Sequence, residues 1–323
     1  MCTAITYHTK DHYFGRNLDY ELSFGETVTI TPRNYQFPCG NLQTIKKHYA
    51  MIGMAYVKDN YPLYYDATNE AGLSMAGLLF SGNAVYLDET EGKDNIAPYE
   101  FIPWILAQCK DVKEARKFLS SLHLVNVPFS KDLPVTPLHW ILADKESVLV
   151  IESVKEGMRM YENPVGVLTN NPPFPYQMWN LSNYMQLSNE VPINRFMRGS
   201  ELETYSRGMG GIGLPGDLSS ASRFVRAAFV RANSKSGQTE EESVTQFFHI
   251  LTSVEQQEGC VKMDSDLYEK TLYSSCCNMD KGLYYYTTYE NRQICVVDMH
   301  KENLDSTMLR QIFLLKKQMF CRQ

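Results

Sequence analysis

The sequence predicts an α+β fold built mainly from antiparallel sheets. Strand patterns come in blocks separated by pairs of helical patterns, whereas a parallel sheet requires strands and helices that alternate along the chain. No linker rich in Pro, Gly and Ser divides the 323 residues, and no segment repeats, so we expect a single domain over residues 1–323. Two sheets with helices on their outer faces would bury the apolar side of every predicted element.

Strand patterns fill most of the first half of the chain. Residues 2–7 and 12–19 predict two strands joined by a turn at Lys10 and Asp11. Residues 26–32 alternate polar and apolar side chains, which predicts a half-buried strand. Further strands are expected at residues 49–57 and 73–80, in a hairpin of residues 138–143 and 147–154, and at residues 158–162 and 165–169, which continue that sheet.

Helical patterns occur at residues 98–110 and 111–122 and again at residues 219–235, where a serine is the candidate cap. Another helix is predicted to start at Thr239, because Glu242 three residues later completes a capping box. The C-terminal part predicts a second hairpin, at residues 283–289 and 293–299, and a last amphipathic helix at residues 305–319.

The composition argues against two classes of protein. The chain has 31 Lys and Arg against 37 Asp and Glu, and this net charge of −6 argues against a general nucleic-acid binder. No apolar run reaches the length of about 18–20 residues that a membrane-spanning helix needs. The first residues lack the basic and apolar regions of a signal peptide, so we expect a cytoplasmic protein that does not bind membranes.

The eight cysteines do not have a spacing typical of disulfides or metal sites. No C-x-x-C pair is present, and a chain of this length buries a core without disulfides. We therefore expect most of the cysteines to be small buried apolar residues, and we expect neither a metal nor an organic cofactor. Cys2 differs from the others because it follows the first methionine.

Cys2 is a candidate nucleophile. Methionine is normally removed before a residue as small as cysteine, and its removal would place a thiol and a free α-amine on the same residue. An α-amine titrates near neutral pH, so a fraction of it is unprotonated and can accept the thiol proton, directly or through water. Such an enzyme needs no catalytic histidine.

Two charged residues follow in the segment of residues 14–19 with the sequence Phe-Gly-Arg-Asn-Leu-Asp. In a bent strand, Arg16 and Asp19 would both approach the N-terminus. Arg16 would favour the thiolate of Cys2, and Asp19 would hold the α-amine and set its direction. The alternative from spacing alone is a surface ion pair of little energetic value.

These features are part of a series of motifs that resembles the choloylglycine hydrolase family, which contains bile salt hydrolases and penicillin V acylases. The series begins with Met-Cys-Thr at residues 1–3 and the segment of residues 14–19. It continues at residues 32–35, 69–73, 91–93, 138–140, 166–172, 213–217 and 222–224. The resemblance therefore covers nearly the whole chain, and it implies a four-layer αββα sandwich of the N-terminal nucleophile hydrolase type.

The resemblance also implies roles for single residues. Cys2 matches the nucleophile, and Arg16 and Asp19 match the charged residues beside it. Asn170 matches a side chain that donates to the oxyanion, and Arg223 matches a second cation near the thiol. Asn171, next to Asn170, has the simpler interpretation of a turn before two prolines.

One position departs from the family. Where bile salt hydrolases typically carry asparagine and penicillin V acylases tyrosine, this chain has Leu79. Its backbone N–H can still be the second oxyanion donor, but the substrate class that the side chain normally indicates is left open. We expect substrate contacts from Leu18, Tyr65, Phe129 and Leu138, and the aromatic residues 61–65 are a candidate rim.

The activity implied by the resemblance is hydrolysis of the amide bond in glycine- or taurine-conjugated bile salts. A penicillin V acylase or an acyl-homoserine lactone acylase of the same family remains an alternative. Two others are a cysteine hydrolase that uses a histidine such as His139, which we interpret as a core residue, and a member that only binds a steroid-like ligand. The resemblance further implies a homotetramer, assembled partly through residues 183–214.

Overall fold

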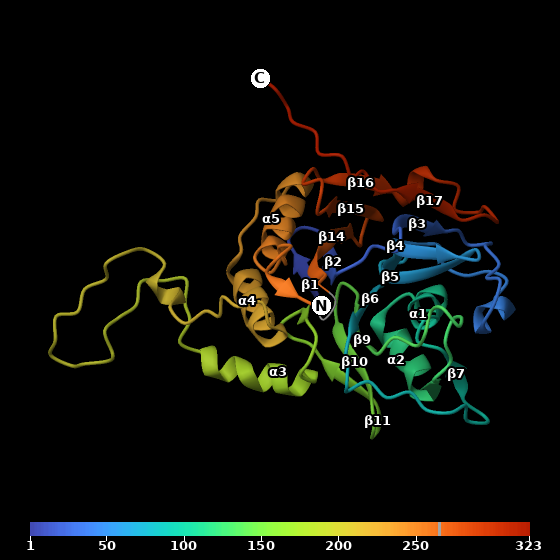
Figure 1. Cartoon of the computed structure of the whole chain (residues 1–323), viewed down its shortest axis with the longest axis horizontal. Coiled ribbons are helices and arrows are strands. Elements are labelled where there is room, and N and C mark those ends of the chain that lie inside the picture. The colour runs from blue at the N-terminus through green and yellow to red at the C-terminus, as the bar shows by residue number, and fades with distance from the viewer. Residues whose placement is uncertain (264–265) are drawn as a thin grey trace.

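Two antiparallel sheets lie face to face in the centre of the molecule, and helices cover their outer faces (Figure 1). The computed structural model describes residues 1–263 and 266–323. Within these residues, no helix has the length and apolarity needed to cross a membrane.

The first sheet carries the N-terminus on β1, which is second from one edge. Its strands lie in the order β12, β1, β2, β14, β15, β16, with β13 beside β14. The predicted hairpin at the N-terminus is confirmed, because β1 pairs with β2 over its whole length. The strands are β1 (Cys2–His8), β2 (His12–Tyr20), β12 (Val167–Leu168), β13 (Val261–Lys262), β14 (Tyr268–Asn278), β15 (Leu283–Thr288) and β16 (Cys295–Asp298).

The second sheet has the order β11, β10, β9, β6, β5, β4, β3, β17. Its strands are β3 (Thr27–Thr31), β4 (Met51–Lys58), β5 (Tyr61–Asn69), β6 (Ser74–Leu79), β9 (Leu138–Ala143), β10 (Val148–Val154), β11 (Gly157–Glu162) and β17 (Arg310–Phe313). A small parallel pair lies apart from both sheets and consists of β7 (Asp94–Ile96) and β8 (Leu122–Leu124).

The helices pack in two layers. The first layer covers the sheet of β1 with α4 (Ser220–Asn233) and α5 (Glu240–Thr252), and the second covers the other sheet with α1 (Phe101–Gln108) and α2 (Val112–Ser121). The capping box at Thr239 and Glu242 is confirmed. Ser219 occupies the predicted N-cap position of α4, but its side chain makes no capping hydrogen bond to the helix. The Ser219 N–H donates to Asp217 Oδ1.

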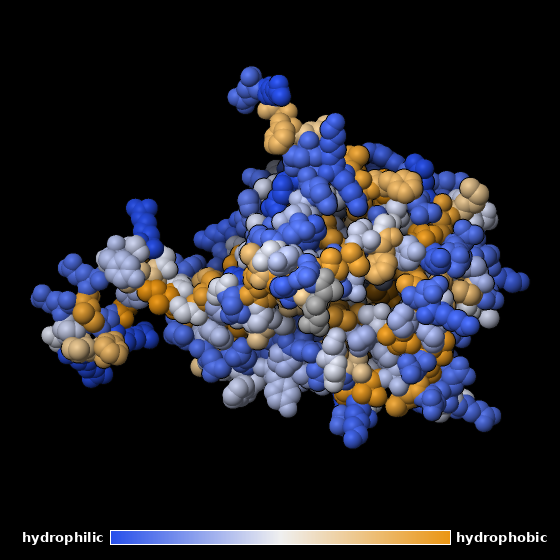
Figure 2. All heavy atoms as spheres, viewed as in Figure 1, coloured by the Kyte–Doolittle hydropathy of each residue, from blue (hydrophilic) through white to orange (hydrophobic). Residues whose placement is uncertain are grey.

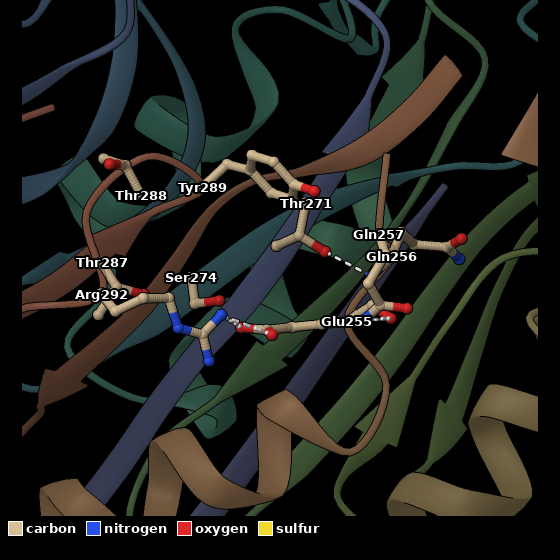
Figure 3. Close-up of a pocket in the computed structure, with 9 residues that line it drawn as sticks. All are labelled: Glu255, Gln256, Gln257, Thr271, Ser274, Thr287, Thr288, Tyr289 and Arg292. Atoms are coloured by element: carbon tan, nitrogen blue, oxygen red, sulfur yellow. Dashed lines mark hydrogen bonds and ion pairs between the residues drawn. The ribbon is translucent and has the colours of Figure 1, made fainter. Parts of the chain in front are cut away.

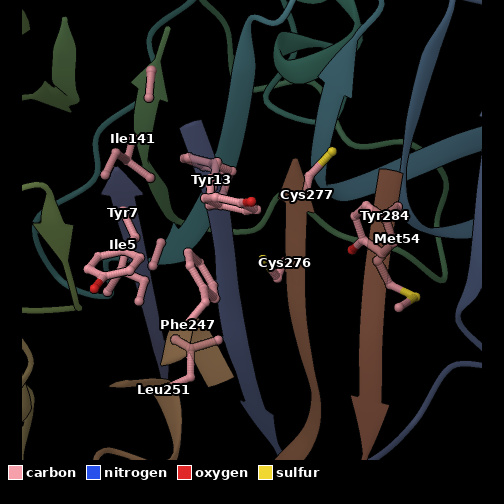
Figure 4. Close-up of a cluster of buried hydrophobic side chains, with 14 of the residues drawn as sticks. Ile5, Tyr7, Tyr13, Met54, Ile141, Phe247, Leu251, Cys276, Cys277 and Tyr284 are labelled. Carbon is pink, nitrogen blue, oxygen red and sulfur yellow. The ribbon is translucent and has the colours of Figure 1, made fainter. Parts of the chain in front are cut away.

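Two apolar clusters stabilise these layers. One lies between the two sheets and under α4 and α5, where Ile5 and Tyr13 meet Phe247 and Leu251 (Figure 4). The other fills the space between the second sheet and helices α1 and α2. Each fully buried aromatic or aliphatic side chain contributes about 1.5–3 kcal/mol relative to exposure. The first cluster includes Cys2, so the N-terminus is anchored in the core.

Several predicted elements are corrected by the structure. The helix at residues 305–319 is wrong: β17 pairs with the free edge of β3, and Ile312 and Leu314 face inward while Phe313 and Leu315 are exposed. This alternation has the period of a strand, and pairing with an open edge outweighs helical propensity. Residues 165–169 do not continue the sheet of β11, because β12 pairs with β1 in the other sheet. Among the described residues, sequence reasoning missed the strands β5, β7, β8, β13 and β14 and the helix α3 (Phe174–Asn180).

A long segment without sheet structure connects α3 to α4 and projects from the body (Figure 1). It contains the short 3-10 turns η2 (Leu181–Tyr184) and η3 (Met209–Gly211). Apolar atoms are visible along its surface (Figure 2). Its exposed apolar side chains include Met185, Val191, Ile193, Phe196, Met197, Leu202, Tyr205 and Ile212.

Candidate active site

The antiparallel pairing of β1 with β2 places three of the predicted residues together. Cys2 lies opposite Leu18, and Ala4 lies opposite Arg16. Because side chains alternate between faces along a strand, Arg16 and Leu18 share the face that carries Cys2. All three line one cavity, and Cys2 is only 5% exposed.

Arg16 is fully buried, and its guanidinium is held by the second sheet. Nη1 donates to the carbonyl oxygens of Tyr65 at 3.0 Å and Gly77 at 2.5 Å. Nη2 has no partner among the described residues. Burial by itself would lower the pKa of Arg16, but the thiol of Cys2 and the carboxylate of Asp66 favour the cation, and the net effect raises the pKa. Arg16 is therefore a permanent positive charge beside the thiol.

Asp19 is buried behind the N-terminus. Its Oδ1 accepts from the Thr271 hydroxyl at 2.6 Å, while Oδ2 lacks a partner within the described chain. Burial raises the pKa of this carboxyl, although Arg223, the N-terminal amine, Thr271 and Arg16 oppose the rise. A cationic amine at the N-terminus would supply the missing partner of Oδ2.

Thr271 also lines a second, polar pocket of about 300 Å³ (Figure 3). The Arg292–Glu255 ion pair forms part of its wall at 2.7 Å. Thr271 Oγ1 also accepts from the backbone N–H of Gln256 at 2.9 Å, which directs its own proton toward Asp19. The Thr271 hydroxyl therefore connects this pocket to Asp19.

The Thr271→Val variant should shift the acidic limb of the pH–activity profile to higher pH. Removing a donor that lowers the pKa of Asp19 raises that pKa further, so the carboxylate is lost earlier on acidification. The expected shift is about one pH unit, since a hydrogen bond to a charged group contributes about 1.5–3 kcal/mol. Initial rates between pH 4 and 8 measure it, and Thr271→Ser should restore the original profile. Coincident acidic limbs for the wild type and Thr271→Val would contradict this role.

Asn170 and Arg223 meet at the backbone of Cys2. Asn170 Oδ1 accepts from the Cys2 nitrogen at 2.8 Å and from Arg223 Nη2 at 2.8 Å. Arg223 Nη1 also donates to the Cys2 carbonyl and to Thr3 Oγ1, both at 2.6 Å. Two donors on Oδ1 set the orientation of the Asn170 amide, so its NH₂ group points the other way and donates to the Leu79 carbonyl at 2.7 Å.

The backbone of Leu79 faces the same space. Leu79 pairs with Leu138 of β9, but the Leu138 N–H donates to the Tyr86 hydroxyl, whereas the Phe80 N–H donates to the Pro137 carbonyl. Bonded and non-bonded pairs alternate along an antiparallel ladder, so the N–H and C=O of Leu79 point away from β9. Since that C=O meets Asn170, the N–H of Leu79 lies on the side of the Asn170 amide.

The cavity at Cys2 has a volume of about 350 Å³, within the range of small-molecule sites. The four predicted contact residues, Leu18, Tyr65, Phe129 and Leu138, all line it, and their contact with substrate stays a prediction. Most of the remaining wall is apolar or aromatic, and it includes Leu22, Phe24, Tyr56, Leu63, Leu79, Tyr99, Ile102, Val127, Leu133 and Val135. The candidate rim is split, because Tyr61 packs in the core against helices α1 and α2, while Leu63, Tyr64 and Tyr65 reach the cavity.

Two residues near the site were missed because β14 was not predicted. Thr271 bonds Asp19, and the carboxylate of Glu269, also on β14, contacts the amine of Met1. The only sequence signal was a run of aromatic and β-branched residues around Tyr273. No group of three or more His, Cys, Asp or Glu side chains able to hold a metal occurs in the part of the chain that the structure describes.

His139 is a core residue, as interpreted from the sequence. It is fully buried, and its ring nitrogens face Glu152 and the Thr169 carbonyl rather than the thiol. Asn171 donates to the Ser81 carbonyl at 2.7 Å and lies in a bend before two prolines, which agrees with its interpretation as a turn residue.

The family model of linear amide C–N hydrolases, choloylglycine hydrolase family, matches residues 2–311. The chain belongs to this family. It is 57% identical, over 96% of its length and 95% of the relative, to a bile salt hydrolase/transferase of Lactiplantibacillus plantarum. It is 40% identical, over 96% of both chains, to a bile salt hydrolase/transferase of Clostridium perfringens.

Two solved structures confirm the predicted αββα sandwich. A crystal structure of a mutant conjugated bile acid hydrolase from Clostridium perfringens aligns with a TM-score of 0.91 and 37% identity, over 100% of this chain and 99% of the other. A penicillin V acylase from Agrobacterium tumefaciens aligns with a TM-score of 0.76 over 96% and 90% of the two chains. Its identity of 18% shows a shared fold alone. As a member of this family, the protein is a linear amide C–N hydrolase.

Proposed function

We propose that this protein hydrolyses the amide bond of glycine- and taurine-conjugated bile salts. The observation that supports it most is a largely apolar cavity that ends at Cys2, Arg16 and Asp19. A sterol ring system is large and apolar, and the cavity wall offers it aromatic and aliphatic side chains. The bile salt hydrolases among the relatives support the same substrate class.

Attack on the amide would start at Cys2 after removal of Met1. The nitrogen of Cys2 would then be an α-amine 2.8 Å from Asn170 Oδ1, with the carboxylate of Asp19 nearby. Burial lowers the pKa of the Met1 amine. Once Met1 is removed, the α-amine of Cys2 would lie in the same buried region, and its unprotonated form is the proposed base. It would accept the thiol proton, and Arg16 would stabilise the thiolate as it attacks the carbonyl carbon.

The tetrahedral oxyanion would lie between the Asn170 amide and the Leu79 N–H. The Asn170 NH₂ group has one hydrogen directed to the Leu79 carbonyl and a second left for substrate. One such donor is worth about 2.7–4 kcal/mol in the transition state. The α-ammonium would then protonate the departing glycine or taurine nitrogen, and water activated by the same amine would release the bile acid. An amine that replaces water would give acyl transfer.

Release of glycine and taurine from conjugated bile salts tests this proposal, with penicillin V hydrolysis measured in parallel. We expect bile salt turnover well above penicillin V turnover, and none in Cys2→Ala. Turnover of penicillin V alone would place the protein with the acylases, and turnover of neither by a correctly processed chain would contradict the proposal.

Leu79→Asn should change selectivity between the two substrate classes while it keeps the backbone donor. The side chain lines the cavity and is half-buried, so asparagine adds a polar group to an apolar wall without changing the strand. We expect a change of about tenfold in the ratio of kcat/KM for bile salt and penicillin V, which corresponds to about 1.4 kcal/mol. An unchanged ratio would show that residue 79 acts through its backbone alone.

We further propose a cytoplasmic homotetramer assembled through the projecting segment of residues 183–214. Phe196 is 90% exposed and Tyr205 84%, which is unusual for large apolar side chains in a monomer. A variant with Phe196→Asp and Tyr205→Asp should dissociate, as measured by light scattering coupled to gel filtration. A wild-type chain that elutes as a monomer would overturn the proposed assembly.

A further inference from the structure

A buried ionisable pair that the mechanism does not use lies behind the oxyanion groups. His139 on β9 and Glu152 on β10 have no exposed side-chain surface. Their strands pair up to Trp140 and Ile151, and the two residues follow one step beyond that pair. His139 Nδ1 lies 3.2 Å from Glu152 Oε1. Burying such a pair is costly unless its polar atoms have partners. His139 Nδ1 and Nε2 and Glu152 Oε1 have partners, whereas Glu152 Oε2 has none among the described residues.

The contacts of the pair indicate which of its atoms donate and which accept hydrogen bonds. His139 Nε2 lies 2.8 Å from the Thr169 carbonyl, which can only accept, so Nε2 carries a hydrogen. Glu152 Oε1 accepts from the Phe174 N–H at 2.9 Å and also faces His139 Nδ1. A hydrogen bond between Nδ1 and Oε1 needs one proton between them, and with that proton on either atom the three contacts remain.

These contacts hold the segment that carries Asn170 at both ends. Thr169 directly precedes Asn170, and Phe174 follows it by four residues. The face of the His139 ring stacks on the ring of Phe80, with the ring centroids 4.3 Å apart and 5° between the planes. Phe80 directly follows Leu79. A single side chain thus contacts the neighbours of both groups assigned to the oxyanion.

We propose that His139 and Glu152 are positioning residues that set the distance between the Asn170 amide and the Leu79 N–H. This inference rests on the proposed role of those two groups. Oxyanion donors act only when they lie about 2.7–3.1 Å from the developing charge, so a small displacement of either lowers the rate of acylation. The Cys2 thiol has no contact with His139 or Glu152, so the intrinsic reactivity of the thiol should not depend on this pair.

Two small probes separate these effects. Acylation by p-nitrophenyl acetate passes through a tetrahedral oxyanion, with the thiolate sulfur bonding to the carbonyl carbon and p-nitrophenolate leaving. Alkylation by iodoacetamide displaces iodide from carbon and needs no oxyanion donor. Neither probe contains a bile acid, so the outcome does not depend on the substrate. Cys260 and Cys321 are exposed, and Cys2→Ala supplies the background to subtract.

His139→Leu should lower the ratio of the acylation rate to the alkylation rate by about tenfold or more. His139→Gln should recover part of it, because its amide can still donate to the Thr169 carbonyl. Glu152→Gln, which keeps the volume, should also lower the ratio, and the two glutamine variants decide the matter if His139→Leu does not fold. His48→Leu is the matched control, because His48 is buried with both ring nitrogens facing backbone carbonyls in the other cluster.

The control should lose thermal stability and keep the wild-type ratio. Equal ratios in the wild type and in the folded His139 and Glu152 variants would overturn the inference and leave the pair a structural role. A proportional loss of both rates would overturn it as well, because it would show damage to the thiol rather than to the oxyanion groups.

Discussion

A form of this protein that carries a removable leader before Cys2 is expected to be inactive until the leader is cut off. In the chain with Met1, the nitrogen of Cys2 belongs to an amide and has no basic lone pair. Met1 also pairs with Asp19, donating to its carbonyl at 2.7 Å and accepting from its N–H at 2.9 Å. While Met1 is present, Cys2 therefore has no α-amine that could act as the base for its own thiol.

Cleavage that leaves Cys2 as the first residue should raise kcat by about 10³-fold or more, the range that a general base contributes. The measurement is amide hydrolysis before and after cleavage, with intact mass to confirm the new N-terminus. Cys2→Ala in the same fusion should stay inactive after cleavage, and Cys39→Ala should behave as the wild type. Full activity of the uncut fusion would show that the base lies elsewhere.

The N-terminal half of the site could be predicted from the sequence because its residues are close along the chain. Cys2, Arg16 and Leu18 need only one hairpin to meet, and the alternation of side chains along its strands puts them on one face. The resemblance to a family supplied Asn170 and Arg223, which lie 168 and 221 residues away from Cys2. Their spacing along the chain gave no reason to place Asn170 and Arg223 beside Cys2.

The parts of the fold and the site that were not predicted depend on tertiary contacts. Strand β14 lies between β2 and β15, and most of its residues are buried, so it lacks the alternation that identifies a half-buried strand. Because β14 was not predicted, nothing in the sequence placed Thr271 and Glu269 near the N-terminus. The C-terminal residues around Ile312 have helical spacing, but an open edge at β3 offered them backbone hydrogen bonds. His139 was assigned to the core correctly, yet its partner Glu152 became evident only when β9 met β10.

Arg223→Met is expected to lower both stability and activity more than any other single change in helix α4. Arg223 is fully buried in the first turns of the helix, and its donors satisfy the carbonyl of Cys2 and the side chain of Asn170. Removing one partner of a buried charge network costs about 3–5 kcal/mol. At about 2–4 °C per kcal/mol for larger domains, the melting temperature should fall by roughly 10 °C.

Activity at a temperature where the variant is folded should fall by about 10²-fold, because the Asn170 amide loses one of the two donors that orient it. Arg223 lowers the pKa of Asp19, so this pKa should rise in the variant. The acidic limb of the pH–activity profile should therefore lie at higher pH than in the wild type. Arg226→Met is the control: one turn further along α4, Arg226 binds the carbonyls of Pro215 and Ser253 and does not contact the N-terminus. If Arg226→Met lowered kcat as much as Arg223→Met at equal folded fraction, the effect would be that of a damaged helix. If only Arg223→Met lowered kcat, the loss would be due to the contacts that this guanidinium makes with Cys2 and Asn170.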